Sequence, residues 1–203
     1  MNIFPNKSKK IIFDACIFMV EISEQKDSFE VIKKVFIDSC FEYFDKILIH
    51  EIVYNDELDE NSKKYIDDKI KIGKAEIIKA PKRDLIYESY LAELENHELL
   101  KSCYRRKNQG EIHSLAYSEL HKIPYFSTND RDAATACKEL KTFQDIEIIG
   151  LEVLLVIAET ILNPEDSKKT RKIRRSIYKK YCKRKGLPNT YSGYCEKFTE
   201  DKA

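Results

Sequence analysis

The sequence predicts an α/β fold in which a parallel sheet is flanked by helices. Short runs rich in Ile, Phe and Val recur along the chain between polar stretches, which is typical of buried parallel strands. Between these runs, apolar residues recur every three or four positions, which is the period of an amphipathic helix. With 203 residues, of which 42% are hydrophobic, the chain can form one core-bearing domain with an appendage.

The first half of the chain contains three expected strands and the helices between them. The run KIIFDACIFMV predicts a buried strand that ends near Asp14. From Ser28 the apolar spacing changes to that of a helix, and Gly73 is the kind of residue that ends one. The elements expected here are strands at 10–13, 46–49 and 76–79 and helices at 28–44, 50–59 and 62–72.

The second half continues the alternation of strands and helices. Strands are expected at 124–127 and 146–149, and helices at 84–102, 109–121, 132–140 and 151–162. Asn163-Pro164 interrupts the last of these helices. A basic amphipathic helix is then expected, because Lys168 to Lys185 contains eleven Lys or Arg residues and no acid. We therefore divide the chain into an α/β domain at 1–162 and a basic helical extension at 163–203.

Composition excludes several classes of protein. Lys and Arg number 36 and Asp and Glu number 35, so the overall charge indicates no polyanion partner by itself. None of the six cysteines forms a C-x-x-C pair, and no His/Cys spacing matches a zinc site. The N-terminus shows no apolar signal segment, so we expect reduced cysteines and a cytoplasmic protein, although an even cysteine count also allows disulfides. No apolar run approaches the ~20 residues of a membrane span.

Four acids are expected at the sheet edge where the parallel strands end. Asp14 ends the first strand and Asp130 follows the fourth, whereas Glu57 and Glu111 lie on helices. Each acid alone has a simpler interpretation, because acids favour helix starts and Asp is an ordinary cap. Asp14 differs because it lies within an apolar run and is expected to be partly desolvated. A divalent cation is one of the few partners that suits several such acids.

The chain resembles the PIN-domain nucleases in four segments, which occur in the family's order within about residues 10–160. These segments are IIFDACIF, HEIVYNDEL, GEIHSLAYSEL and IPYFSTNDRDA. The resemblance implies a five-stranded parallel sheet within an α/β/α sandwich. It also implies an endoribonuclease that hydrolyses RNA phosphodiester bonds with Mg²⁺ or Mn²⁺ bound by its acids.

The resemblance implies a role for each matching residue. The catalytic acids would be Asp14, Glu57, Glu111 and Asp130, and the metal ligands would be Asp14, Glu111, Asp130 and Asp132. Thr128 matches the hydroxyl that orients the site. Glu57 is preferred to Glu51 and Asp56 because Leu58 follows it. Three basic residues before Gly110 are candidates for binding substrate phosphates, with a solvated helix end as the equal alternative; they are Arg105, Arg106 and Lys107.

Several functional alternatives stay open. Many proteins that resemble the PIN-domain nucleases are toxins neutralised by an antitoxin protein, so an antitoxin is one open partner. A homodimer is also left open. A catalytically inactive PIN-like module that binds RNA or protein is the main alternative, and a structure-specific DNA nuclease is a third. The basic segment 168–185 would bind RNA, dock on an acidic partner, or form only a solvated helix face. Tyr104 and Tyr125 are the tyrosines to test for stacking on bases.

Overall fold

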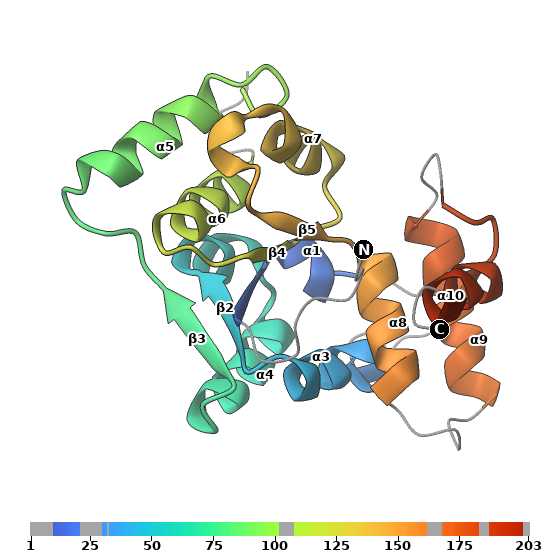
Figure 1. Ribbon diagram of the computed structural model, residues 1–203. Coiled ribbons are helices and arrows are strands. Elements are labelled where there is room, and N and C mark those ends of the chain that lie inside the picture. The colour runs from blue at the N-terminus through green and yellow to red at the C-terminus, as the bar shows by residue number, and fades with distance from the viewer. Residues whose placement is uncertain are drawn as a thin grey trace.

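The computed structural model describes residues 10–20, 30–31, 33–101, 108–161, 168–182 and 187–200. Its centre is a five-stranded sheet in the order β3-β2-β1-β4-β5, in which every neighbouring pair is parallel (Figure 1). The strands are β1 (Lys10–Phe13), β2 (Lys46–His50), β3 (Ala75–Ile78), β4 (Tyr125–Ser127) and β5 (Glu147–Ile149). The predicted α/β/α sandwich with a five-stranded parallel sheet is therefore confirmed.

Helices cover both faces of this sheet (Figure 1). Successive residues of a strand point to opposite faces, so Ile11 and Phe13 of β1 pack on one side and Ile12 on the other. The described helices are α1 (Ala15–Phe18), η1 (Lys33–Ile37), α3 (Asp38–Tyr43), η2 (Val53–Glu57), α4 (Glu60–Lys71), α5 (Leu85–Glu95), α6 (Gln109–Leu120), α7 (Arg131–Glu139), η3 (Lys141–Phe143), α8 (Leu151–Ile161), α9 (Lys168–Tyr181) and α10 (Tyr191–Glu200).

The two faces carry different sets of helices. The face that Ile11 and Phe13 enter is covered by buried side chains from η1, α3, α4 and α8, and the core continues into α9 and α10. The opposite face is covered by α5, α6 and α7, whose buried residues pack around Ile12 and Phe126. This arrangement leaves α1, η2 and the beginnings of α6 and α7 at the edge where the strands end.

The helices α9 and α10 pack beside α8 (Figure 1). The Tyr191 hydroxyl of α10 donates a hydrogen bond to the Leu155 carbonyl of α8 at 2.9 Å. Arg174 of α9 is 0% exposed, donates to the Val35 carbonyl at 3.0 Å, and pairs with Glu159. The C-terminal helices therefore share their core with this face of the sheet. The division of the chain at residue 162 stays a prediction.

One helix ends well before the residue expected from the sequence, and one helix was not expected at all. Helix α5 ends at Glu95 rather than at residue 102, because the Asn96 side chain donates to the Ala92 carbonyl and tight turns follow. The tail beyond residue 186, for which no element was predicted, contains helix α10. No helix in the described ranges has both the length and the apolar character needed to cross a membrane.

Candidate active site

The ends of β1 and β4 lie side by side at the centre of the sheet. The register pairs Phe13 with Ser127, so the next residues, Asp14 and Thr128, are neighbours. The Asp14 backbone N–H donates to the Ser127 carbonyl at 3.0 Å, and the Thr128 hydroxyl donates to Asp14 Oδ2 at 3.1 Å. Two sequence segments more than a hundred residues apart therefore meet at one carboxylate, where we expected the centre of the site.

Asp14 is buried to an extent that is unusual for a carboxylate. Its side chain is 1% exposed, and its Oδ1 atom has no hydrogen-bond partner among the described residues. Burial raises the pKa of the Asp14 carboxyl, although hydrogen bonds from Cys16 and Thr128 oppose the shift. A buried oxygen without a partner is costly, so the protein retains Asp14 here at the expense of stability.

Glu57 reaches the same region from the end of η2, after β2. A Cβ atom added to Gly110 would lie 2.5 Å from Glu57 Oε1 and 2.8 Å from Val53 Cγ2, which is closer than real contacts allow. Glycine at position 110 thus permits η2 to approach the start of α6. Burial, and then the charge of Asp14, raises the pKa of Glu57 to about 7, while a hydrogen bond from the Gly110 backbone opposes the shift.

Glu111 lies in the first turn of α6, and the charges of the other three predicted catalytic acids act on its pKa. Burial raises the pKa of Glu111 to about 8, and the negative charges of Asp14, Glu57 and Asp130 contribute in the same direction. The fold therefore places the charges of Asp14, Glu57 and Asp130 within electrostatic reach of Glu111, although the four residues belong to separate segments of the chain.

Asp130 begins helix α7, and Asp132 follows within its first turn. Asp130 Oδ1 accepts hydrogen bonds from the backbone N–H groups of Asp132 at 2.7 Å and Ala133 at 3.0 Å. The Asp132 side chain is exposed, and no described contact joins its carboxyl to the other acids. Thr128 accepts from the Asp130 N–H at 3.0 Å while donating to Asp14, so it links two of the acids.

Cys16 is a residue of this region to which the sequence analysis assigned no role. Its sulfur accepts a hydrogen bond from the Asn129 N–H at 3.0 Å and lies 3.6 Å from the Thr128 hydroxyl oxygen. Burial, followed by the charge of Asp14, raises the pKa of the Cys16 thiol well above its usual value. Cys16 therefore stays a thiol that holds the loop after β4 against α1. Its position two residues after Asp14 was the signal available in the sequence.

Most of the residues predicted to contact the substrate lie outside the described part of the chain, and one lies within it. Arg105, Arg106 and Lys107 lie outside the described residues, as does Tyr104, so their assignment stays a prediction. Tyr125 is 7% exposed within β4, which is too buried for stacking on a base.

The five described cysteines, Cys16, Cys40, Cys137, Cys182 and Cys195, form no disulfide.

The fit of a divalent cation can be tested against these side chains. Within the described ranges, no group of three or more His, Cys, Asp or Glu side chains is arranged to hold a metal ion. However, the buried Asp14 Oδ1 has no hydrogen-bond partner there, and burial, followed by the charges of neighbouring acids, raises the pKa values of Glu57 and Glu111. A cation would give that oxygen a partner and offset the repulsion between the acids, so the chemistry of the donor set fits a divalent cation.

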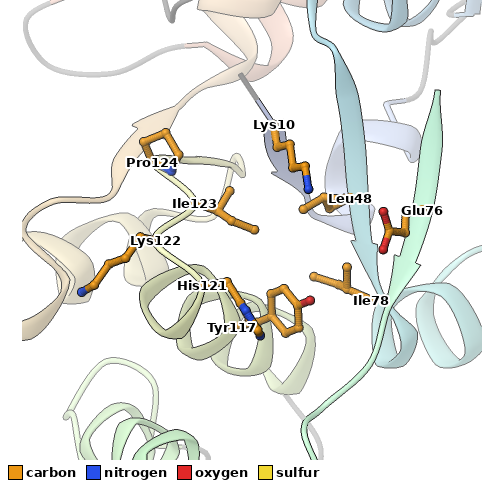
Figure 2. Close-up of a pocket in the computed structure, with 9 residues that line it drawn as sticks. All are labelled: Lys10, Leu48, Glu76, Ile78, Tyr117, His121, Lys122, Ile123 and Pro124. Atoms are coloured by element: carbon orange, nitrogen blue, oxygen red, sulfur yellow. The ribbon is translucent and has the colours of Figure 1, made fainter. Parts of the chain in front are cut away.

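A cavity of about 390 Å³ lies apart from the acids. Figure 2 shows Lys10 at the start of β1 and Tyr117 and His121 near the end of α6 among its lining residues. Two of the acids lie at the opposite ends of the same two elements, since Asp14 follows β1 and Glu111 is in the first turn of α6. The ten residues from Glu111 to His121 span about 15 Å of helix. The cavity is therefore not part of the candidate active site.

Comparisons of this chain with protein-family models, with curated proteins and with solved structures find no match. The buried Asp14, the charges that act on Glu111, the Thr128 and Cys16 contacts, and Gly110 are therefore the basis on which a function is argued.

Proposed function

We propose that this protein is a divalent-metal-dependent endoribonuclease of the PIN-domain type. The observation that carries the proposal is Asp14, a buried carboxylate with one oxygen unpartnered in the described structure, at the end of the central strand. The charge of Asp14 contributes to the raised pKa values of Glu57 and Glu111, and the charges of Glu57 and Asp130 contribute to that of Glu111. Acids gathered at this edge of a parallel sheet are best explained as a cation site.

The residues of the site would have distinct tasks. Asp14, Glu111 and Asp130 would hold Mg²⁺ or Mn²⁺, because hard cations prefer carboxylate oxygens. Thr128 orients Asp14 through a hydrogen bond, and Cys16 contacts Thr128 and the Asn129 N–H. Glu57, with its pKa raised to about 7, can accept or give a proton near neutral pH. When bound, the ion would supply a water of lowered pKa and offset charge on the phosphoryl oxygens.

The proposal is tested by cleavage of a generic single-stranded RNA in Mn²⁺ or Mg²⁺. We expect cleavage by the wild type, and a loss of at least 100-fold with Asp14→Asn, because a carboxylate ligand is removed. Asp45→Asn is the matched control, since Asp45 is exposed and lies before β2, at the opposite edge of the sheet. Equal cleavage by wild type and Asp14→Asn would remove the catalytic assignment.

The choice of RNA rather than DNA rests on the resemblance to the PIN-domain nucleases, and competition between the two substrates under one metal condition tests it. An antitoxin partner has the same basis, whereas a cytoplasmic location is proposed because the five described cysteines are free thiols. A small acidic protein encoded in the neighbouring open reading frame would support the toxin interpretation, and its absence would favour RNA processing or defence.

The second candidate is a catalytically inactive PIN-like module that binds RNA or protein. The observation that favours it is the lack, within the described residues, of a group of side chains already arranged as metal ligands. The two candidates differ in one measurement. Divalent ions would stabilise the nuclease against unfolding through Asp14, whereas the inactive module would gain no stability that depends on Asp14.

A further inference from the structure

Helix α9 is fixed on the protein through one of its faces. Ile177 and Tyr178 are buried on this face, and the fully buried Arg174 bonds to the Val35 carbonyl. Glu159 of α8 pairs with both Arg174 and Arg171. The packing therefore determines which side of α9 is turned away from the core, and it neutralises the cations nearest α8.

The opposite face of α9 carries a stripe of cations. Its four members are exposed and occur at positions i, i+4, i+7 and i+11 of the helix; they are Lys168, Lys172, Arg175 and Lys179. This spacing places them on one line, about 16 Å long at 1.5 Å per residue. None of the four has an ion pair with an acid in the part of the chain that the structure describes.

The stripe is more basic than a solvated helix face requires. Neighbouring cations three or four residues apart destabilise a helix, whereas Glu at alternate places would stabilise it. Helix α9 contains no acid at any of its positions, although acids and bases are almost equal in number in the whole chain. An external polyanion would remove this repulsion, and charge complementarity thus identifies the kind of partner.

The composition of this face favours nucleic acid over protein. Protein interfaces contain an apolar or aromatic core, and Lys is depleted there. The exposed residues of α9 are polar or charged, and its large apolar side chains turn towards the core. Cations repeated about every 5 Å along a line suit a backbone with one phosphate per nucleotide.

We propose that the stripe of Lys168, Lys172, Arg175 and Lys179 binds the phosphate backbone of the RNA substrate. The identification of this RNA as substrate rests on the proposed function. Recognition is electrostatic and independent of base sequence, since no described group in the stripe reads base edges. Four phosphate contacts correspond to a slope of about −3 for the logarithm of affinity against the logarithm of salt concentration.

The experiment measures RNA binding separately from cleavage. Fluorescence anisotropy follows a short labelled single-stranded RNA in EDTA, with Asp14→Asn present in every protein so that no cleavage occurs. The test variant carries Lys172→Gln, Arg175→Gln and Lys179→Gln. The control carries Lys64→Gln, Lys138→Gln and Lys141→Gln, which change the same net charge at exposed positions on α4, α7 and η3. Thermal unfolding checks that both variants are folded.

We expect the test variant to lose at least tenfold in affinity near 0.1 M salt and its salt slope to become shallower by about 2, with the control unchanged. Equal losses in the two variants, or no loss in the test variant, would overturn the inference. Polyglutamate that competes as well as unlabelled RNA of equal charge would also overturn it, in favour of an acidic protein. If the test variant loses binding but the wild type cleaves nothing, this inference stands and the proposed nuclease function fails.

Discussion

At the scale of single residues, the site combines a buried charge with a close backbone approach. Asp14 accepts a hydrogen bond from Thr128 through Oδ2, yet Oδ1 is buried without a partner in the described part of the chain. A position of this kind lowers the stability of the folded protein unless a ligand compensates. Function and stability are therefore expected to oppose each other at Asp14.

The first prediction concerns the stability of an Asp14→Asn variant. Removal of the buried charge should stabilise the metal-free protein by about 1 kcal/mol at pH 8 while abolishing cleavage, because the neutral amide has a smaller desolvation cost. Urea denaturation in EDTA measures the free energy of unfolding. Asp45→Asn should change it by less than about 0.5 kcal/mol. A clearly destabilised Asp14→Asn would show that the carboxylate has partners that compensate its burial.

The second prediction concerns Gly110→Ala. The added methyl group would displace the Glu57 carboxylate, which lies 2.5 Å from the position of the new Cβ. We expect cleavage to fall at least tenfold, because a carboxylate of the site moves. Stability should change little, since alanine favours the helix by up to about 1 kcal/mol while the contact with Val53 opposes this gain. Full activity in Gly110→Ala would exclude Glu57 from the mechanism.

At the scale of elements, β2, α5 and α6 meet in a buried polar group. The Tyr87 hydroxyl of α5 lies 2.8 Å from His113 Nδ1 of α6 and 3.5 Å from His50 Nε2 of β2. Burial, followed by the nearby His113, lowers the pKa of His50 to about 4, and burial lowers the pKa of His113. Both rings are therefore expected to be neutral at pH 7, which makes them structural groups rather than phosphate-binding cations.

The third prediction follows from this pKa of His50. Unfolded histidine gains its proton near pH 6.5, whereas folded His50 gains it only near 4. Its contribution to stability is complete above pH 6.5 and is lost as the pH falls towards 4. His50→Gln should reduce the loss of stability in this window by on the order of 2 kcal/mol, as measured by urea denaturation at several pH values. The control His121→Gln should keep the wild-type profile, and an unchanged profile in His50→Gln would contradict the prediction.

At the scale of the whole molecule, the sequence predicts the sheet better than it predicts the helix ends. Strand β1 lies at the predicted residues 10–13 because a buried parallel strand is apolar on both faces, which a local pattern reveals. Helix α10 was missed because tertiary contacts stabilise it, including the Tyr191 hydrogen bond to α8. Local sequence does not encode such contacts.

The candidate site was predictable in its acids but not in its geometry. Strand ends and helix starts indicated Asp14, Glu57, Glu111 and Asp130, because parallel strands must end at one edge. The exposure of Asp132 depends on the cap of α7, where Asp130 is bonded to the Asp132 backbone. The tight contact between Gly110 and Glu57 depends on how η2 packs on α6. Both of these features require the folded structure.

The fourth prediction concerns the stability of the metal-free molecule above neutral pH. The folded pKa values of Glu57 and Glu111, about 7 and about 8, exceed the value of 4.5 for unfolded glutamate. Their favourable contribution is complete below pH 4.5 and is lost as the pH rises through 7 and 8. Urea denaturation in EDTA should show on the order of 2 kcal/mol less stability at pH 8.5 than at pH 6.5, since partial solvation reduces the effect. Glu111→Gln should flatten this decline, and a flat wild-type profile would contradict the prediction.

The most direct test of the central claim is calorimetric titration of Mn²⁺ into the wild type and into Asp14→Asn at pH 8. If the acids around Asp14 form a cation site, the wild type will bind Mn²⁺ saturably. Asp14→Asn will bind at least tenfold more weakly, and Asp45→Asn will bind like the wild type. Absence of binding by the wild type, or equal binding by the wild type and Asp14→Asn, would contradict the account.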